Sequence, residues 1–232
     1  IAFFSHFIKG LVKKQNPFKT GWQGVKNEYM LLKGLFSGGS QRTKSRFTRE
    51  LPQTTAGFWA SYFSNLFGFT RKVSSWGGAT VSQLEPAFLK GSKAFTLGSY
   101  IMGGSSIEAD PDNVIFQHEY GHYLQSQEMG WSYLFKVAIP SLKSAAGDGM
   151  HCFFKTEQDA NMRSLIYMSE NVEGFYRTKN QLDKDKGWNF LKNPLDPNSE
   201  RVRGRYYDVR DASVRSDLIK SLSLTGGLWY IR

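Results

Sequence analysis

The stretch FQHEYGHYLQS, residues 116–126, constrains this 232-residue chain more than any other segment. Its apolar neighbours predict a helix, in which each residue turns by about 100°, so His122 lies only about 40° around the axis from His118 and about 6 Å further along it. Both imidazoles can therefore reach one ion. Glu119 falls beside them, where its carboxylate can meet a metal-bound water. Two histidines and a glutamate at this spacing are typical of a zinc hydrolase helix.

The alternative is a polar helix face that binds no metal. With four histidines and ten glutamates in the chain, a chance match has a probability of roughly 0.3 per cent. The neighbours Val114, Ile115, Phe116 and Leu124 also predict that the helix is buried. Because buried histidines beside a buried carboxylate need partners, we favour the metal site.

Two helices are expected around this motif. Asp110 is predicted to cap the first, with Pro111 at the first helical position, and Gly130 to end it. Thr156 is predicted to cap the second, with Asp159 three residues later completing a capping box.

A catalytic zinc usually takes three protein ligands and leaves a fourth position to water. Glu128 stands where an extended HExxHxxGxxH pattern places its last ligand, but that pattern requires a glycine where this chain has Gln125. Glu157 is the favoured third ligand, because small neighbours such as Ala160 share its side of the second helix and allow close packing. The alternative for Glu157 is a first-turn glutamate that favours the helix dipole.

Three further residues are candidates for supporting roles. Asp159 and Asn161 are expected to accept the outer N–H groups of the ligating imidazoles. His151 is predicted either as an alternative ligand or as a catalytic group that stabilises a developing oxyanion. A histidine on a surface loop is an equally good interpretation of His151.

The segments before the motif predict β-structure. SSWGGATVSQ, residues 74–83, and KAFTLGSYIMGG, residues 93–104, are each expected to form one short strand. The second could be an edge strand that pairs with an extended peptide. The tail is expected to hold turns at 193–199, a strand at 206–209 and a short helix at 213–223. The character of the chain changes at Ser74, so we divide it into an arm, residues 1–73, and a second domain, residues 74–232.

The arm is expected to be basic, aromatic and mostly helical. Between Ile1 and Val12, apolar residues recur at helical spacing with lysines on the other side, which predicts an amphipathic helix. We expect it to pack on a neighbouring domain, with contact to a membrane interface as the alternative. Helices are also predicted at 22–36 and 58–69, with SGGSQRTKSR, residues 37–46, as a flexible linker between them.

The net charge of +10 is carried by the front of the chain. Residues 1–100 hold fourteen basic against three acidic residues, whereas residues 101–232 hold sixteen against seventeen. A solvated basic surface is the common meaning of such an excess, and contact with an acidic partner, a membrane or a nucleic acid is the alternative. No clear nucleic-acid site stands out. The single cysteine, Cys152, excludes an internal disulfide, and no apolar run approaches the ~18 residues of a spanning helix.

HEYGH followed by EQDAN resembles the gluzincin type of zincin-like metallopeptidase. The block FTLGSYIMGGSSIEADPDNVIFQHEYGHYLQSQEMGW, continued by TEQDANMRSLIY and NPLDPN, resembles zincin-like domains at the C-terminal ends of bacterial RHS/YD-repeat proteins, a class of polymorphic toxins and secreted effectors. The resemblance spans about residues 74–198. It implies an α+β fold, with a small antiparallel or mixed sheet packed on the HExxH helix and a following glutamate helix. It also implies that Zn2+ is held by His118, His122 and Glu157, with Glu119 as the general base.

The resemblance further implies a setting. The chain would be released from a larger bacterial RHS-type polypeptide, secreted or delivered into a target cell, and it would hydrolyse a protein or peptide there. A cognate immunity protein would be its inhibitor. Two other hypotheses remain open: a zincin-shaped domain that binds or processes its parent without turnover of foreign proteins, and a basic module that acts on membrane or nucleic acid through residues 1–73.

Overall fold

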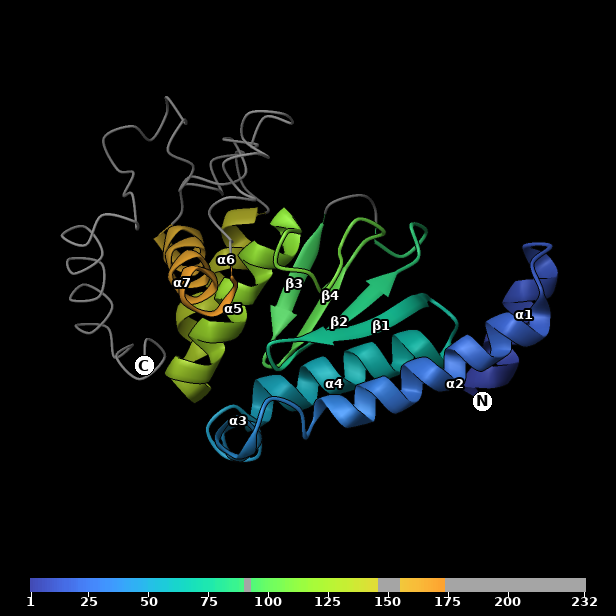
Figure 1. Ribbon diagram of the computed structural model, residues 1–232, viewed down its shortest axis with the longest axis horizontal. Helices are drawn as coiled ribbons and strands as arrows, with labels where there is room; N and C mark the ends of the chain where they lie inside the picture. The colour runs from blue at the N-terminus through green and yellow to red at the C-terminus, as the bar shows by residue number, and fades with distance from the viewer. Residues whose placement is uncertain (90–92, 146–154, 174–232) are drawn as a thin grey trace, which may run out of the picture.

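The computed structural model describes residues 1–89, 93–145 and 155–173 (Figure 1). Within these residues the chain forms seven α-helices and a mixed four-stranded sheet, so the predicted α+β class is confirmed. The elements are α1 (Ala2–Val12), α2 (Pro17–Gly34), α3 (Ser40–Arg46), α4 (Leu51–Leu66), β1 (Thr70–Trp76), β2 (Ala79–Leu84), β3 (Ala94–Leu97), β4 (Tyr100–Gly103), α5 (Val114–Met129), a 3-10 turn (Gly130–Ser132), a π-helical turn (Leu134–Ala138), α6 (Ile139–Ala145) and α7 (Lys155–Asn171).

The sheet has the strand order β1-β2-β4-β3, which leaves β3 at one edge. β2 and β4 run parallel, while the β1–β2 and β3–β4 pairs are antiparallel hairpins. The prediction of one strand in each segment was wrong, because glycines inside both segments turn the chain back. Gly77, Gly78 and Gly98 adopt positive φ angles of 55°, 89° and 60°, which residues with a Cβ atom rarely adopt.

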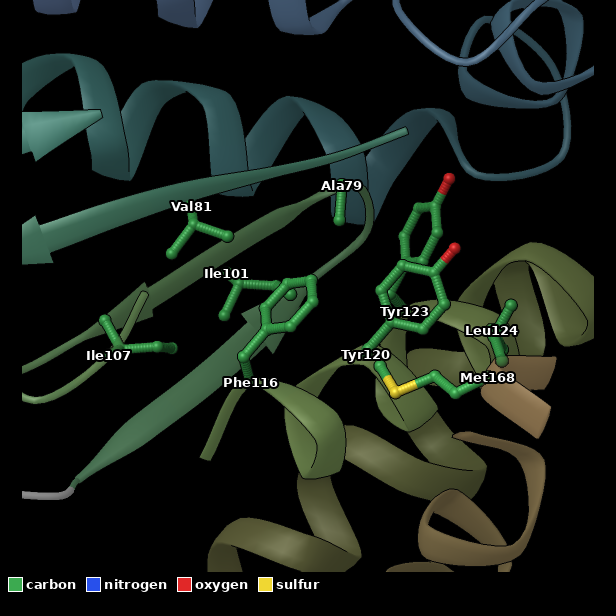
Figure 2. Packing of buried hydrophobic residues seen from close by; sticks show 9 residues of the cluster. All are labelled: Ala79, Val81, Ile101, Ile107, Phe116, Tyr120, Tyr123, Leu124 and Met168. Atoms are coloured by element: carbon green, nitrogen blue, oxygen red, sulfur yellow. The ribbon is translucent and has the colours of Figure 1, made fainter. Parts of the chain in front are cut away.

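Helices cover both faces of the sheet. Neighbouring residues of a strand point to opposite faces, and on β4 Tyr100 joins a cluster with Leu31 of α2, whereas Ile101 joins the larger cluster around α5. Figure 2 shows this larger cluster, in which Phe116 and Tyr120 of α5 pack with Val81 and Ile101 of the sheet and Met168 of α7. α2 and α4 thus form one outer layer, and α5 with α7 forms the other (Figure 1).

The prediction of a flexible linker at residues 37–46 was wrong, because part of the segment is helical and buried. Residues 40–46 form α3, and Arg46 is only 1% exposed. Its guanidinium donates to Ser99 Oγ at 2.7 Å and to the carbonyl oxygens of Leu35 at 3.3 Å and Gly78 at 2.5 Å. A buried arginine is tolerated here because backbone acceptors satisfy its fixed fork of donors.

The predicted helices of the arm are present, with shifted ends. α1 matches its prediction, but it packs on α2 through Ala2, His6 and Gly10, while apolar residues such as Phe4 and Ile8 remain exposed. α2 starts earlier than predicted because the Asn16 side chain caps it, and α4 begins at Leu51 rather than near residue 58. No described helix is long and apolar enough to cross a membrane.

The ends of the motif helix are partly as predicted. Gly130 ends α5 with a φ of 55°, which confirms that prediction. The start was wrong: Asn113 caps α5 by accepting from Phe116 N at 2.9 Å, whereas Asp110 accepts from Asp112 N in a preceding turn.

The capping box at the second helix was also wrong. α7 begins at Lys155, so Thr156 lies inside the helix, and its hydroxyl donates to Glu157 Oε1 at 3.1 Å. Asp159 is engaged by other side chains. His151 and the predicted turns, strand and helix of the tail lie outside the described residues.

Candidate metal centre

The centre lies beside a close contact between α5 and α7. A Cβ atom at Gly121 would lie 1.9 Å from the carbonyl oxygen of Ala160, so only glycine fits at this position of the motif. Because the two backbones come this close, the first turn of α7 faces the histidine side of α5. Glu157 is thereby carried to the pair His118 and His122.

The three side chains converge on one point. Glu157 Oε2 lies 3.1 Å from His118 Nε2 and 3.1 Å from His122 Nε2. One ligand atom from each residue lies within 4.8 Å of the others. His122 and Glu157 are buried, while the His118 side chain keeps 26% of its surface open. The group could hold a metal ion, with one side accessible.

Hydrogen bonds fix which nitrogen of each imidazole faces the centre. His118 Nδ1 lies 2.8 Å from Asn161 Oδ1, and His122 Nδ1 lies 2.8 Å from Gln125 Oε1. The amide of Gln125 is oriented by its NH2 group, which donates to Thr156 O at 2.9 Å and to Asp159 Oδ2 at 2.7 Å. Both Nδ1 atoms therefore donate, and in a neutral imidazole the lone pair is left on Nε2.

This arrangement fits a cation. Two Nε2 lone pairs and a carboxylate oxygen repel one another unless protons or a positive ion lie between them. Burial lowers the pKa of His118, but the hydrogen bond to Glu157 and the charge of Glu119 raise it to about 9. Burial raises the pKa of Glu157, but the two histidines hold it well below its usual range. The centre thus attracts protons when no metal is bound, and a divalent cation would compete with them.

Glu119 lies next to the centre, and a residue of the sheet holds its side chain in place. Its side chain is buried, and Thr96 of the edge strand β3 donates to Oε2 at 2.6 Å. The hydroxyl of Tyr133 donates to Thr96 O at 3.1 Å, which ties the same strand to the turn after α5. The Glu119 carboxylate is therefore fixed by a contact outside its own helix.

A cavity of about 290 Å³ opens beside these groups. Its polar end holds His118, Glu119, His122 and Glu157. The rest is mainly apolar and lies between the edge strand and the α6 region, with the lining residues Ala94, Phe95, Thr96, Leu97, Tyr133, Ala138, Ser141, Leu142 and Ala145.

The predicted site residues have different outcomes. His118, His122 and Glu157 come together, and Asn161 contacts His118 as expected. Asp159 contacts neither imidazole, but supports His122 indirectly through Gln125.

The alternative ligand Glu128 points away from the centre and forms a buried ion pair with Arg163 of α7. Sequence reasoning missed Thr96, because only tertiary packing brings β3 against α5. It also missed the role of Gln125, for which the spacing of three residues from His122 on one helix was an available signal.

Comparisons with protein-family models, with curated proteins and with solved structures found no match for this chain.

Proposed function

We propose that this chain is a zinc-dependent metallopeptidase that hydrolyses peptide bonds with a metal-activated water. The observation that carries the proposal is the convergence of His118 Nε2, His122 Nε2 and Glu157 Oε2 beside the carboxylate of Glu119. The sequence block around the motif extends the proposal to a zincin-like effector domain of a larger, secreted RHS-type bacterial protein. A target-cell protein would be its substrate and an immunity protein its inhibitor.

Zinc is the metal that suits these ligands best. Two neutral imidazoles and one carboxylate form a common ligand set of catalytic zinc, which keeps a fourth position for water or substrate. Asn161 and Gln125 supply the outer hydrogen bonds that ligating histidines usually make. The partial exposure of His118 gives the open side on which a substrate can approach.

The protein groups divide the chemistry among them. A zinc ion held here would lower the pKa of a coordinated water and polarise the substrate carbonyl. Glu119 accepts the proton of the attacking water and passes it to the leaving amine. Thr96 occupies Oε2 of this carboxylate, so Oε1 is the natural acceptor. His151, as a candidate for oxyanion stabilisation, remains a sequence-based prediction.

The edge strand and the cavity suggest how a peptide binds. β3 lies at the edge of the sheet beside Glu119, so an extended peptide can add to it through backbone hydrogen bonds. Its scissile carbonyl would then lie near the metal. The apolar end of the cavity, with Leu97 and Leu142, favours an apolar side chain next to the cleaved bond.

Glu119→Gln and Glu157→Ala test the proposal as a pair. The glutamine keeps the size of Glu119 and an oxygen that can accept from Thr96, so the fold and the metal should stay. We expect one zinc per chain in the unaltered protein and in Glu119→Gln, with peptidase activity on unfolded protein substrates reduced by about 10²- to 10⁴-fold in the variant. Glu157→Ala should lose zinc on mild dialysis.

Three results would contradict parts of this proposal. Absence of bound metal in the unaltered chain would leave HEYGH as a polar helix face. Full activity in Glu119→Gln would remove the general base. Bound zinc without turnover of any protein or peptide, and without harm to cells that express the chain, would favour a zincin-shaped binding domain.

A further inference from the structure

Helices α1, α2 and α4 have the reverse of the usual amphipathic arrangement. In water-soluble proteins the apolar stripe of a helix faces the core. Here, apart from Leu31 of α2, the buried residues of these helices are small or polar. The buried residues of α4 are Gln53, Thr54, Gly57, Ser61, Ser64 and Asn65, and those of α2 are Gly21, Gly24, Asn27, Leu31 and Gly34.

Hydrogen bonds fix this polar interior in place. His6 Nε2 lies 3.0 Å from the carbonyl oxygen of Asn65, and the Asn65 side chain donates to Gly24 O at 2.9 Å, which joins α1, α4 and α2. Asn27 accepts from Val73 N at 3.0 Å and so ties α2 to β1. The inward direction of these faces is therefore specified by contacts, and the apolar faces must point outward.

The outward face of α2 is a continuous apolar stripe. At about 100° per residue, the four members of the stripe within α2 fall within about 40° of one direction. The exposed fractions along the stripe run from 46% at Leu32 to 66% at Phe36. The stripe consists of Phe18, Trp22, Tyr29 and Leu32 of α2, continued by Phe36 two residues after the end of the helix.

α4 adds a second stripe to the same surface. Trp59, Phe63 and Phe67 recur every four residues and are 47%, 46% and 64% exposed. α2 and α4 lie on the same face of the sheet (Figure 1). Because their buried residues pack inward, both stripes lie on the side away from the sheet. The Tyr62 hydroxyl, which donates to Glu28 at 2.8 Å, links α4 to α2. We call the two stripes together the aromatic face.

The charge beside the aromatic face points to its partner. Lys19, Lys26 and Lys33 are exposed and recur every seven residues, so they form a row along one side of the α2 stripe. Residues 1–100 as a whole carry fourteen basic against three acidic residues. An apolar stripe flanked by lysines is the pattern of helices that lie in the interface of an anionic membrane.

We propose that the aromatic face docks on the surface of an anionic lipid membrane. In this proposal the chain lies on the membrane surface, with the aromatic side chains in the interface. A second copy is a poorer partner, because packing two such faces together brings their lysine rows close to each other. The metal centre lies in the layer on the other side of the sheet, and docking would leave it facing water.

Vesicle binding of the full chain tests this inference. The probes are neutral phosphatidylcholine vesicles and the same vesicles with about 30 per cent phosphatidylserine, mixed with protein and sedimented. We expect the unaltered chain to bind the anionic vesicles at least about tenfold more tightly, since each lysine near such a surface contributes about fivefold. Trp22→Ser with Phe36→Ser should weaken binding by about tenfold or more.

Two further variants separate the contributions. Lys19→Glu with Lys26→Glu should remove the preference for anionic lipid. Trp131→Ser with Phe135→Ser is the matched control, because these aromatics are 63% and 73% exposed but lie in the turns after α5, outside the aromatic face. The control should bind within about twofold of the unaltered chain.

All variants should keep their bound metal and far-ultraviolet circular dichroism, which separates this test from that of the peptidase. Absence of vesicle binding by the unaltered chain would overturn the inference, as would an equal loss in the control. A lipid-independent dimer at micromolar concentration that Trp22→Ser with Phe36→Ser abolishes would assign the aromatic face to a second copy instead.

Discussion

Replacing Gly121 by alanine should disassemble the metal centre without touching a ligand. The added Cβ would lie 1.9 Å from Ala160 O and 2.4 Å from the carbonyl carbon of the same residue, both backbone atoms that cannot rotate away. Ordinary contact begins at 3.4 Å, so α7 must retreat by about 1.5 Å at this point. Glu157 lies one turn away on the same helix and would move with it. Zinc–ligand distances tolerate only about 0.2 Å, so the carboxylate would leave the coordination sphere.

The expected result is a fall in zinc affinity of at least about 100-fold. Stability should fall as well, because overpacking costs about 1–3 kcal/mol. The higher helix propensity of alanine offsets only about 1 kcal/mol of this cost. Affinity is measured by competition with a chromophoric chelator, and stability by thermal unfolding of the metal-free chain.

Gly34→Ala is the matched control. Its Cβ would meet Thr80 Oγ1 at 2.2 Å in the other layer of the fold, so it should lower stability while one zinc per chain is retained. If Gly121→Ala binds zinc with unaltered affinity, then the close approach of α5 and α7 does not set the ligand spacing, and the reasoning is refuted.

Three other predictions concern single groups. Thr96→Val removes the hydrogen bond to Glu119 and should lower kcat by about tenfold with zinc content unchanged, as steady-state kinetics can show; an unaltered kcat would assign Thr96 to packing alone. The pKa of His118 in the metal-free chain is raised to about 9, so protonated His118 contributes its full stabilisation below pH 6.5 and loses it as pH rises through 9. The melting temperature should therefore fall over that range, and it should fall less in His118→Gln. Burial and then Lys9 lower the pKa of His6, so unfolding should take up a proton and stability should fall below pH 6.5, by at most about 1.4 kcal/mol per pH unit, with His6→Gln as the comparison.

The relative directions of the motif side chains on α5 could be predicted because they depend on local sequence alone. His118, Glu119 and His122 share one helix, whose regular geometry fixes their relative directions from the sequence spacing alone. The choice of Glu157 over Glu128 depended on two local arguments: the missing glycine at position 125 and the small neighbours on its helix. Both agree with the packing of α5 on α7.

The contacts between elements could not be predicted in the same way. Thr96 reaches Glu119 only because the hairpin of β3 and β4 closes at Gly98, whereas the sequence pattern predicts a single strand through this turn. The predicted N-cap of α5 was wrong for a different reason. Asp110 and Asn113 are both good capping residues, and the preceding turn uses Asp110, which leaves the cap to Asn113.

The helices of the arm show what a hydrophobic pattern cannot predict. A helical period separates an apolar face from a polar face, but it does not say which face turns inward. The periodicity predicted for α1 is correct, but only part of its apolar stripe packs inward. His6 and Gly10 lie against α2 with Phe3 beside them, while Phe4 faces outward. The glycines at positions 21 and 24 were the available signal, since a Cβ at either would come within 3 Å of α1.

The two layers of the fold therefore assign different tasks to the two sides of the sheet. On one side, close packing at Gly121 brings His118, His122 and Glu157 together, and the cavity opens along the edge strand. On the other side, close packing at Gly24 forces apolar side chains outward beside a row of lysines. A chain docked by the aromatic face would receive its peptide from water, along β3, and not from the lipid. For the proposed peptidase, docking would raise its local concentration near membrane-associated substrates and would leave kcat for a soluble peptide unchanged.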